Sequence, residues 1–545
     1  MPGGYPAPLL FRLPLLIIRG MAISLSKVWR FLAVLALAAP ETALAEWNPA
    51  EAERTIAFGF SAIVERHLQP VTAASVAIDA MRGLADIDPQ FGVSVQDGMV
   101  RLSTAEAVVG EFAAPPDDEA AAWAKVTAAV IGAARPQSER LRDSDPEKLY
   151  QAVFEGALGK ADLYSRYAGA REAREHRANR NGFGGIGIRF DLVESEPRIV
   201  EVIEDTPAAR AGLRAGDVIV MIDGQPARSL DRVDISSRLR GAVSSELSLL
   251  VRRDGEPLRI DLRRSRIVPR TVTMTLADGI ARFRISSFNR LTAHSLEEQL
   301  KTARERLGPG FLGVVLDLRG NPGGLLDKAV AVADLFIAQG PIVSTKGRHP
   351  DSVNSFAAHP GDIGEGLPVV VLVDGRSASA AEIVASALQD AGRAVVVGTN
   401  SYGKGTVQTV IDLPNGGEIT LTWSRFHAPS GYALHGLGVL PTLCTGQGMS
   451  IQAVQAGLAG GTWPLRLPET LAVWRSAGPA ETDLRLRLRN GCPPSRRIDI
   501  KADMDLAERL LLDGAAHARA LALSTPPRTL EARRPGSGEA EAAQH

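Results

Sequence analysis

The sequence is poor in cysteine, has no excess of charge of either sign, and lacks the repeated long apolar runs of a many-pass membrane protein. Two cysteines in 545 residues exclude a disulfide-dense scaffold and a four-cysteine zinc site within one chain. The 61 basic and 62 acidic residues leave a formal net charge of -1, so charge gives no reason to expect nucleic acid as a partner. With 45% hydrophobic and 23% charged residues the composition is globular, and the length predicts about three or four domains.

Residues 1–45 have the three-part pattern of a secretory signal peptide. Basic residues precede an apolar run at 31–39, and small residues follow it up to Ala45. We expect cleavage after Ala45, with Met21 as the natural start and residues 1–20 as an over-long start assignment. The pattern predicts a periplasmic or secreted protein of the cell envelope. The alternative is an uncleaved membrane anchor, although the run is too short to span a bilayer. Only in that case is a membrane a partner.

The expected compartment changes how the two cysteines are interpreted. Cys444 and Cys492 form an even pair in an oxidising space, where disulfides form and persist. A bond between them would close a loop of nearly fifty residues and stabilise the fold by roughly 4 kcal/mol in the chain-entropy model. The alternative is two separate buried thiols.

Composition and periodicity divide the rest of the chain into segments that differ in predicted secondary structure. Apolar residues recur at helical spacing in the first part, whereas short strands and glycine turns follow it. Buried strands then alternate with helices, which implies right-handed parallel crossovers. The end of the chain is rich in Pro, Gly, Ala and Glu, as is typical of a disordered tail. The expected segments are 46–180 (helical), 182–266 (strand-rich), 267–444 (alternating), 445–523 (a C-terminal region) and 524–545 (tail).

Two glycine motifs imitate nucleotide-binding sites but lack the required context. The G-x-G-x-x-G spacing at 182–187 is followed by a predicted strand at 188–193, whereas the dinucleotide fingerprint needs a helix there. The phosphate-loop spacing at 398–404 continues with Gly405 in place of Ser or Thr, and then with a predicted strand at 407–411. We therefore expect no cofactor, and no metal.

A serine and a lysine lie beside two of the expected buried strands. Ser379 opens a predicted helix after the strand at 368–373, where unpaired N–H groups can stabilise an oxyanion. Lys404 follows the strand at 394–397, where burial would lower its pKa enough for it to act as the base for a serine hydroxyl. Taken singly, Ser379 is better explained as a helix cap and Lys404 as an exposed turn lysine.

A series of motifs in matching order resembles the carboxy-terminal processing peptidases, also called tail-specific proteases. The resemblance covers roughly residues 140–443, whereas 46–139 and the chain after 445 match only loosely. The matching motifs are Asp162-Leu163-Tyr164-Ser165-Arg166-Tyr167, Gly184-Gly185-Ile186-Gly187-Ile188, residues 207–224, Ile285-Ser286-Ser287-Phe288, Leu316-Asp317-Leu318-Arg319-Gly320-Asn321-Pro322-Gly323-Gly324, residues 377–390, Tyr402-Gly403-Lys404-Gly405, Ala428-Pro429-Ser430-Gly431 and residues 436–441.

The resemblance implies a fold and a recognition domain. The fold is an α/β peptidase core of the crotonase/ClpP-like ββα type at 267–444, with an inserted, mostly β PDZ domain at 182–266 and a helical N-terminal segment. A PDZ domain takes a peptide C-terminus as an added strand and holds its carboxylate in backbone N–H groups. The loop that matches this carboxylate-binding role is Gly185, Ile186, Gly187 and Ile188.

The resemblance also implies a Ser–Lys dyad. The family places the serine twenty-five residues before the lysine, a spacing that Ser379 and Lys404 keep. A glutamine four residues after the lysine orients it, and Gln408 matches; we expect Lys404 to open a strand on which Gln408 shares its face. The oxyanion donors are expected among the backbone N–H groups of Gly323, Gly324 and Ala380.

The expected function is that of a serine endopeptidase which recognises substrate C-termini and cleaves through an acyl-enzyme. Its partners are proteins or peptides with apolar C-termini, together with a possible adaptor protein and a possible homo-oligomer. The alternative is an envelope scaffold that binds C-terminal peptides without cutting them. Ala381 stands where the family often has serine, without a part in the dyad. His427 and His435 match no family motif and are expected to be structural.

Overall fold

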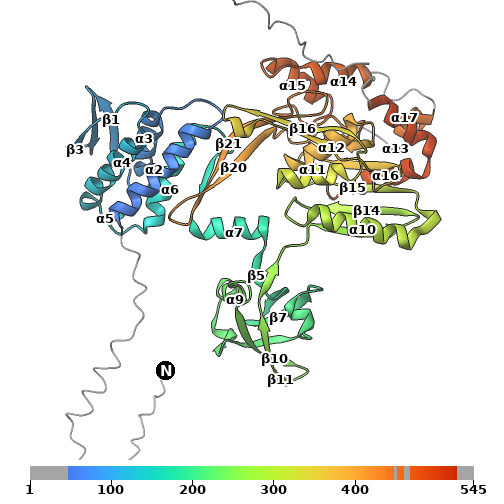
Figure 1. Cartoon of the computed structure of the whole chain (residues 1–545), viewed down its shortest axis with the longest axis horizontal. Helices are drawn as coiled ribbons and strands as arrows, with labels where there is room; N and C mark the ends of the chain where they lie inside the picture. The colour runs from blue at the N-terminus through green and yellow to red at the C-terminus, as the bar shows by residue number, and fades with distance from the viewer. Residues whose placement is uncertain (1–46, 447–450, 460–466, 525–545) are drawn as a thin grey trace, which may run out of the picture. The chain divides into compact units, whose positions relative to one another are not determined.

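The computed structural model describes residues 47–446, 451–459 and 467–524 (Figure 1). The expected signal peptide lies outside these residues, and so does nearly all of the expected tail. Among the described helices, none combines the length and the apolar composition that crossing a membrane requires.

The N-terminal part is built from helices whose starts are marked in the sequence. Asn48 caps the first by accepting the N–H groups of Ala50 and Glu51, and Asp145 caps a later one through the N–H of Glu147. A three-stranded antiparallel sheet accompanies the helices. The elements are α2 (Pro49–Arg66), α3 (Ala73–Arg82), β1 (Gly92–Gln96), β2 (Met99–Ser103), β3 (Val108–Ala113), α4 (Ala120–Ala134) and α6 (Pro146–Gly159).

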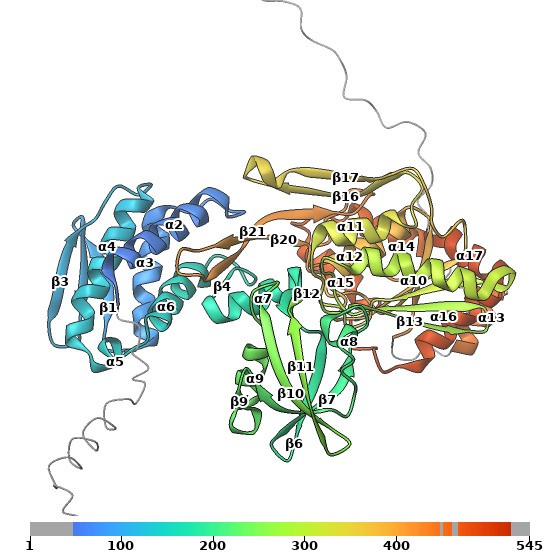
Figure 2. The same cartoon turned by 60° about the horizontal axis from the view of Figure 1, so that its bottom comes forward.

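The strand-rich part forms a compact sheet around its own apolar core, drawn in green in Figure 2. Its strand order is β11-β10-β8-β7-β6, so β6 lies at an edge. Asp254 and Gly255 both have positive φ (51° and 91°), as a two-residue hairpin turn between β10 and β11 requires. The elements are β6 (Ile188–Val193), β7 (Glu196–Val202), α8 (Pro207–Arg210), β8 (Val218–Ile222), α9 (Arg232–Leu239), β10 (Glu246–Arg253) and β11 (Glu256–Arg263).

The alternating part forms a six-stranded sheet in the order β13-β14-β15-β18-β19-β22. All its pairs from β14 onward are parallel, and every residue of β15, β18 and β19 is buried, which explains their continuous apolar sequences. The strands are β13 (Val272–Ala277), β14 (Ile280–Ile285), β15 (Gly313–Asp317), β18 (Val369–Val373), β19 (Ala394–Gly398) and β22 (Leu443–Cys444).

Helices cover both faces of this sheet, because successive side chains of each strand point to opposite sides. Val369, Val371 and Val373 pack in one apolar cluster with residues of α10 (Thr292–Leu307), α11 (Leu326–Asp334) and α12 (Ala380–Asp390). Val370 and Leu372 pack in another with residues of α16 (Lys501–Leu512) and α17 (Gly514–Ser524). The region at 445–523, set apart in the sequence, therefore supplies the second helical layer of the core.

A second, antiparallel sheet has the strand order β17-β16-β21-β20. Its strands are β16 (Gly340–Gly347), β17 (Asn354–Ala358), β20 (Thr406–Asp412) and β21 (Glu418–His427), the yellow and orange ribbons of Figure 2. The short strand β4 (Arg166–Ala168) pairs with β21, so the chain before the strand-rich part shares this sheet with the chain after it.

Candidate active site

Three loops meet where the parallel strands of the core end. The loops at 318–324, 374–379 and 399–404 follow β15, β18 and β19, which are neighbours in the sheet. Ligands and reacting groups in open α/β sheets gather outside the carboxyl ends of the strands. The Asn-Pro-Gly-Gly motif, Ser379 and Lys404 each lie on a different one of these loops.

Ser379 occupies a strained backbone conformation directly before α12. Its φ is 55° and its ψ is -113°, a region that non-glycine residues rarely adopt and that costs roughly 1–3 kcal/mol. The Gly323 Cα lies so close that a Cβ added there would be 2.8 Å from the Ser379 Cβ. The turn places the half-buried Ser379 at the positive end of the α12 dipole. Such placement is typical of a nucleophile at a sharp strand-to-helix turn.

Glu382 joins the serine loop to the lysine loop. Its fully buried carboxylate accepts on Oε2 from the backbone N–H groups of Ser379 (2.8 Å) and Lys404 (2.9 Å). On Oε1 it accepts from the Ser401 hydroxyl (2.5 Å) and the Gly403 N–H (2.6 Å). Burial raises the pKa of Glu382, and these four donors oppose that rise. Because all four neighbours donate, the site satisfies the ionised form, and it holds the Ser379 and Lys404 backbones side by side.

Sequence reasoning did not single out Glu382. The signal that could have identified it is the Ser-x-x-Glu spacing of a helix capping box, since Ser379 precedes α12 and Glu382 is the third helical residue. Its bonds to the lysine loop have no local signal, because they bridge about twenty residues of sequence.

The Lys404 side chain is half-buried and has no carboxylate partner within the part of the chain that the structure describes. Its Nζ lies 5.0 Å from the centre of the Tyr164 ring. Burial lowers the pKa of Lys404, and the positive charge of Arg166 lowers it further, against the opposing charges of Glu382 and Asp162. The direction favours the neutral amine that a general base requires.

Gln408 lies on β20, but Lys404 does not open that strand. β20 begins at Thr406, so the expectation that Lys404 is its first residue is wrong. The Gln408 amide donates to the hydroxyls of Thr406 (2.9 Å) and Thr422 (3.3 Å), which fixes its side chain on the face of β20 and β21.

The backbone N–H groups expected to bind the oxyanion differ in whether they already donate to an acceptor within the described chain. The Gly323 N–H donates to Asn321 Oδ1 at 2.8 Å, so the structure contradicts its expected place among the donors. The N–H groups of Gly324 and Ala380 have no acceptor within the described chain. A helix N-terminus and a glycine turn thus leave two donors beside Ser379.

A cavity of about 500 Å³ borders the lysine loop and is lined by residues that include Tyr164, Tyr402, Gly403, His435 and Arg489. The His435 ring meets the Tyr164 ring edge to face, with 6.2 Å between their centres. Burial lowers the pKa of His435, and the charges of Arg425 and Arg485 lower it further, which favours the neutral ring. This ring packs against Tyr164, the same ring over which the Lys404 Nζ lies.

The candidate carboxylate loop of the strand-rich domain precedes edge strand β6. The Ile186 and Gly187 carbonyl oxygens accept from the N–H groups of Ala208 and Ile203 (both 2.9 Å). The N–H groups of Ile186 and Gly187 have no acceptor in the described residues, and Gly187 has a φ of +85°. The loop therefore leaves N–H groups for an anion beside an edge that can take an added strand.

The fold and these loops define a serine peptidase that carries a PDZ domain. The family model "Peptidase family S41" matches residues 279–444, and the model "PDZ domain" matches residues 198–253.

Similar proteins include the carboxy-terminal-processing protease of Bartonella bacilliformis, which is 38% identical over 317 residues, or 57% of this chain and 73% of the relative. A probable CtpA-like serine protease of Staphylococcus saprophyticus is 29% identical over 307 residues, or 56% of this chain and 62% of the relative. A solved photosystem II D1 C-terminal processing protease is 22% identical, with a TM-score of 0.37, over 72% of this chain and 92% of that chain. The chain belongs to the carboxy-terminal processing peptidases of family S41, as the resemblance in the sequence implies.

Proposed function

We propose that Ser379 is the nucleophile and Lys404 the general base of this protease. The observation that carries the proposal is the single Glu382 oxygen that accepts the N–H of both residues. Neutral Lys404 takes the Ser379 hydroxyl proton as the oxygen attacks the scissile carbonyl, and an acyl-enzyme forms as the amine leaves. Water then releases the shortened product. The N–H groups of Gly324 and Ala380 hold the oxyanion, and Gln408 orients the lysine loop by way of Thr406, two residues after Lys404, to which its amide donates.

We infer that the PDZ domain selects substrates by their C-termini. A chain end adds as a strand along β6, and its carboxylate binds the N–H groups that precede the strand, in the loop from Gly185 to Ile188. Ile188, the last residue of this loop, is apolar and only partly buried against the domain core, so it favours an apolar C-terminal side chain. The substrate is therefore an unfolded or extended protein end, and the protein works in the periplasm or outside the cell after its signal peptide is removed.

The test is a turnover assay on an unfolded protein with an apolar C-terminus. Mass spectrometry of the products should show internal cleavage by the wild-type chain, with many turnovers per enzyme. Binding of the same protein without any cleavage would instead support the non-catalytic scaffold.

Amidation of the substrate C-terminus should raise KM about tenfold or more and leave kcat nearly unchanged. The amide removes the charge that the PDZ loop would bind, and hydrogen bonds to charged groups contribute roughly 1.5–3 kcal/mol. The measurement compares a peptide with its amidated form, with KM and kcat fitted separately. Equal KM values for the two peptides would contradict recognition through the carboxylate.

A further inference from the structure

We propose that residues 489–503, here called the strap, are a positioning element that holds the three active-site loops in register, and that the Cys444–Cys492 disulfide fastens it. The strap begins with the last two residues of α15 (Thr482–Asn490) and ends in the first turn of α16. The inference rests on the proposed dyad, because it concerns the placement of the same three loops.

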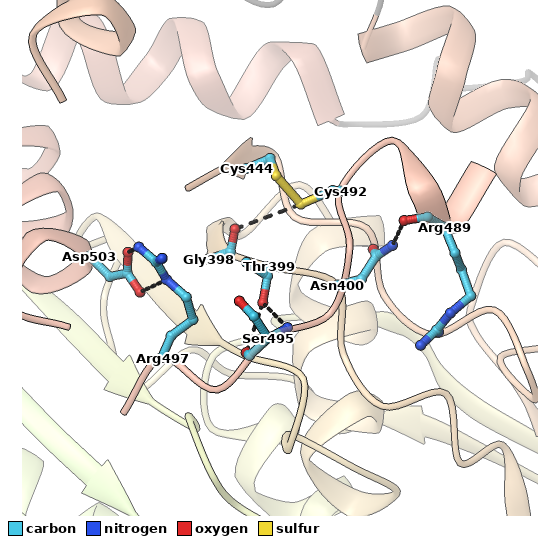
Figure 3. The surroundings of a disulfide bond; sticks show 9 residues. All are labelled: Gly398, Thr399, Asn400, Cys444, Arg489, Cys492, Ser495, Arg497 and Asp503. Atoms are coloured by element: carbon cyan, nitrogen blue, oxygen red, sulfur yellow. Dashed lines mark hydrogen bonds and ion pairs between the residues drawn. A yellow bond between two sulfur atoms is a disulfide. The ribbon is translucent and has the colours of Figure 1, made fainter. Parts of the chain in front are cut away.

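The disulfide ties the strap to the edge of the core sheet. Cys492 lies in the strap and is buried, and its sulfur is bonded to that of Cys444 (Figure 3). Cys444 ends β22, where it pairs with Gly398, the last residue of β19. The bond is therefore one residue away from the loop that carries Lys404.

The strap contacts the first two loops through backbone groups. Arg319, in the loop of the Asn-Pro-Gly-Gly motif, donates through Nη1 to the carbonyl oxygens of Arg497 (3.1 Å) and Ile500 (2.8 Å). Gly375, in the serine loop, donates its N–H to the Ser495 carbonyl oxygen at 2.8 Å. Both loops thus form hydrogen bonds, near their first residues, with the same short stretch of chain.

The strap binds the lysine loop more extensively than the other two. Thr399 and Ser495 exchange two hydrogen bonds, both of 3.2 Å, between the threonine hydroxyl and the serine backbone (Figure 3). The Asn400 amide donates to the Arg489 carbonyl oxygen at 3.2 Å, and Arg489 donates through Nη2 to the Tyr402 carbonyl oxygen at 3.2 Å. Thr399 and Asn400 are fully buried, whereas the Arg489–Tyr402 bond is exposed.

An ion pair closes the strap on itself beside the first loop. Figure 3 shows the pair of Arg497 and Asp503. The Arg497 Nη2 and the Asp503 Oδ1 are 2.6 Å apart, and the fully buried Asp503 also lies 3.7 Å from Arg319. Three loops from separate strands are thus bound to one segment with a covalent bond near one end and an ion pair near the other. Misplacement of reacting groups by about 1 Å costs roughly 100-fold in rate.

The test uses two variants that loosen the strap in different ways. C444S/C492S removes the disulfide, and Thr399→Val removes both bonds to Ser495 while keeping the side-chain shape. Each should lower kcat for a peptide substrate about tenfold and change KM less than twofold, because the dyad loses its geometry while the PDZ domain is untouched. Thr399→Ser, which keeps the hydroxyl, should restore the rate.

A pH profile separates positioning from general destabilisation. The charged and titratable groups that face Lys404 are Asp162, Tyr164 and Arg166, from one short stretch of chain, and Glu382 from α12. If the loosened loop admits water, Lys404 becomes less buried, its pKa rises, and the acid limb of kcat moves to higher pH in both variants. The matched control is Leu471→Ala on α14 (Leu467–Ser476), a buried residue of the same C-terminal region that should lower Tm without changing kcat or the limb.

Reduction tests the disulfide in the unmodified protein. A dithiol such as dithiothreitol transfers two electrons, so the Cys444–Cys492 bond breaks, both sulfurs take up a proton, and the reagent closes into its own disulfide. The reduced wild-type chain should match C444S/C492S, which itself should not respond to the reagent.

Unchanged kcat and an unchanged acid limb in C444S/C492S and Thr399→Val would overturn the inference, and so would an equal fall of kcat in Leu471→Ala. Neither result touches the proposed dyad, whose failure would appear separately as turnover by Ser379→Ala.

Discussion

Alanine at Ser379 or at Lys404 is expected to lower kcat by about 10⁴-fold or more, with the fold retained. In the proposed mechanism, loss of the serine removes the atom that forms the acyl-enzyme, and loss of the lysine removes the base that deprotonates the hydroxyl. Both side chains are only partly buried, so neither truncation opens a large cavity in the core. Single-turnover kinetics on a peptide substrate, with circular dichroism to confirm folding, measures the effect.

The double variant distinguishes a dyad from two independent contributions. Residues that act as a unit are strongly non-additive, so Ser379→Ala combined with Lys404→Ala should be no slower than either single variant. Additive losses, or near-normal turnover by either single variant, would show that the assignment is wrong.

The protonation of Lys404 should set the acid limb of the kcat profile. The pKa of Lys404 is lowered, first by burial and then by Arg166, so activity should persist well below the pH at which ordinary lysines become protonated. Arg166 is exposed, and Arg166→Gln removes a charge that disfavours the ammonium form. The pKa of Lys404 should then rise and the acid limb should move to higher pH, with kcat retained on the alkaline plateau.

The sequence predicted the parts of this fold that depend on local pattern. Continuous apolar runs identified β15, β18 and β19, and the spacing of Ser379 and Lys404 at the ends of two of these strands identified the candidate site. The family resemblance supplied the PDZ domain and the peptidase core, which the family models match. Periodicity, strand burial and motif spacing are all properties of a short stretch of chain.

The contacts that organise the site depend on residues far apart in the chain and leave no local pattern. Nothing near Thr399 indicates that Ser495 binds it, and nothing near Lys404 indicates that Glu382 accepts its backbone N–H. For the same reason the sequence separated 445–523 from the core, although α16 and α17 cover one face of its sheet. Such pairings follow from tertiary packing, which periodicity does not encode.

Replacement of Glu382 should lower kcat about 100-fold and also destabilise the fold by roughly 3 kcal/mol or more. Glu382→Ala leaves three buried backbone N–H groups without their acceptor, and each unsatisfied buried donor costs roughly 1–3 kcal/mol. Ser379 would lose the bond that supports its strained φ, and the lysine loop would no longer be held to it. Glu382→Gln should lower kcat and stability nearly as much as Glu382→Ala. Its NH₂ group is a donor and would have to face N–H or O–H donors on one of the two loops.

Gln389→Ala is the matched control for Glu382, because Gln389 is also a buried polar residue of α12. Its amide donates to the Leu440 carbonyl oxygen and the Thr442 hydroxyl, away from the dyad, so the variant should unfold more easily yet keep its kcat. The pH profile gives a second criterion. The charge of Glu382 raises the pKa of Lys404, so Glu382→Gln should move the acid limb to lower pH even as the plateau falls. If the acid limb of Glu382→Gln stays at its wild-type pH, or if its kcat on the plateau is as high as that of Gln389→Ala, then Glu382 does not hold the two loops together.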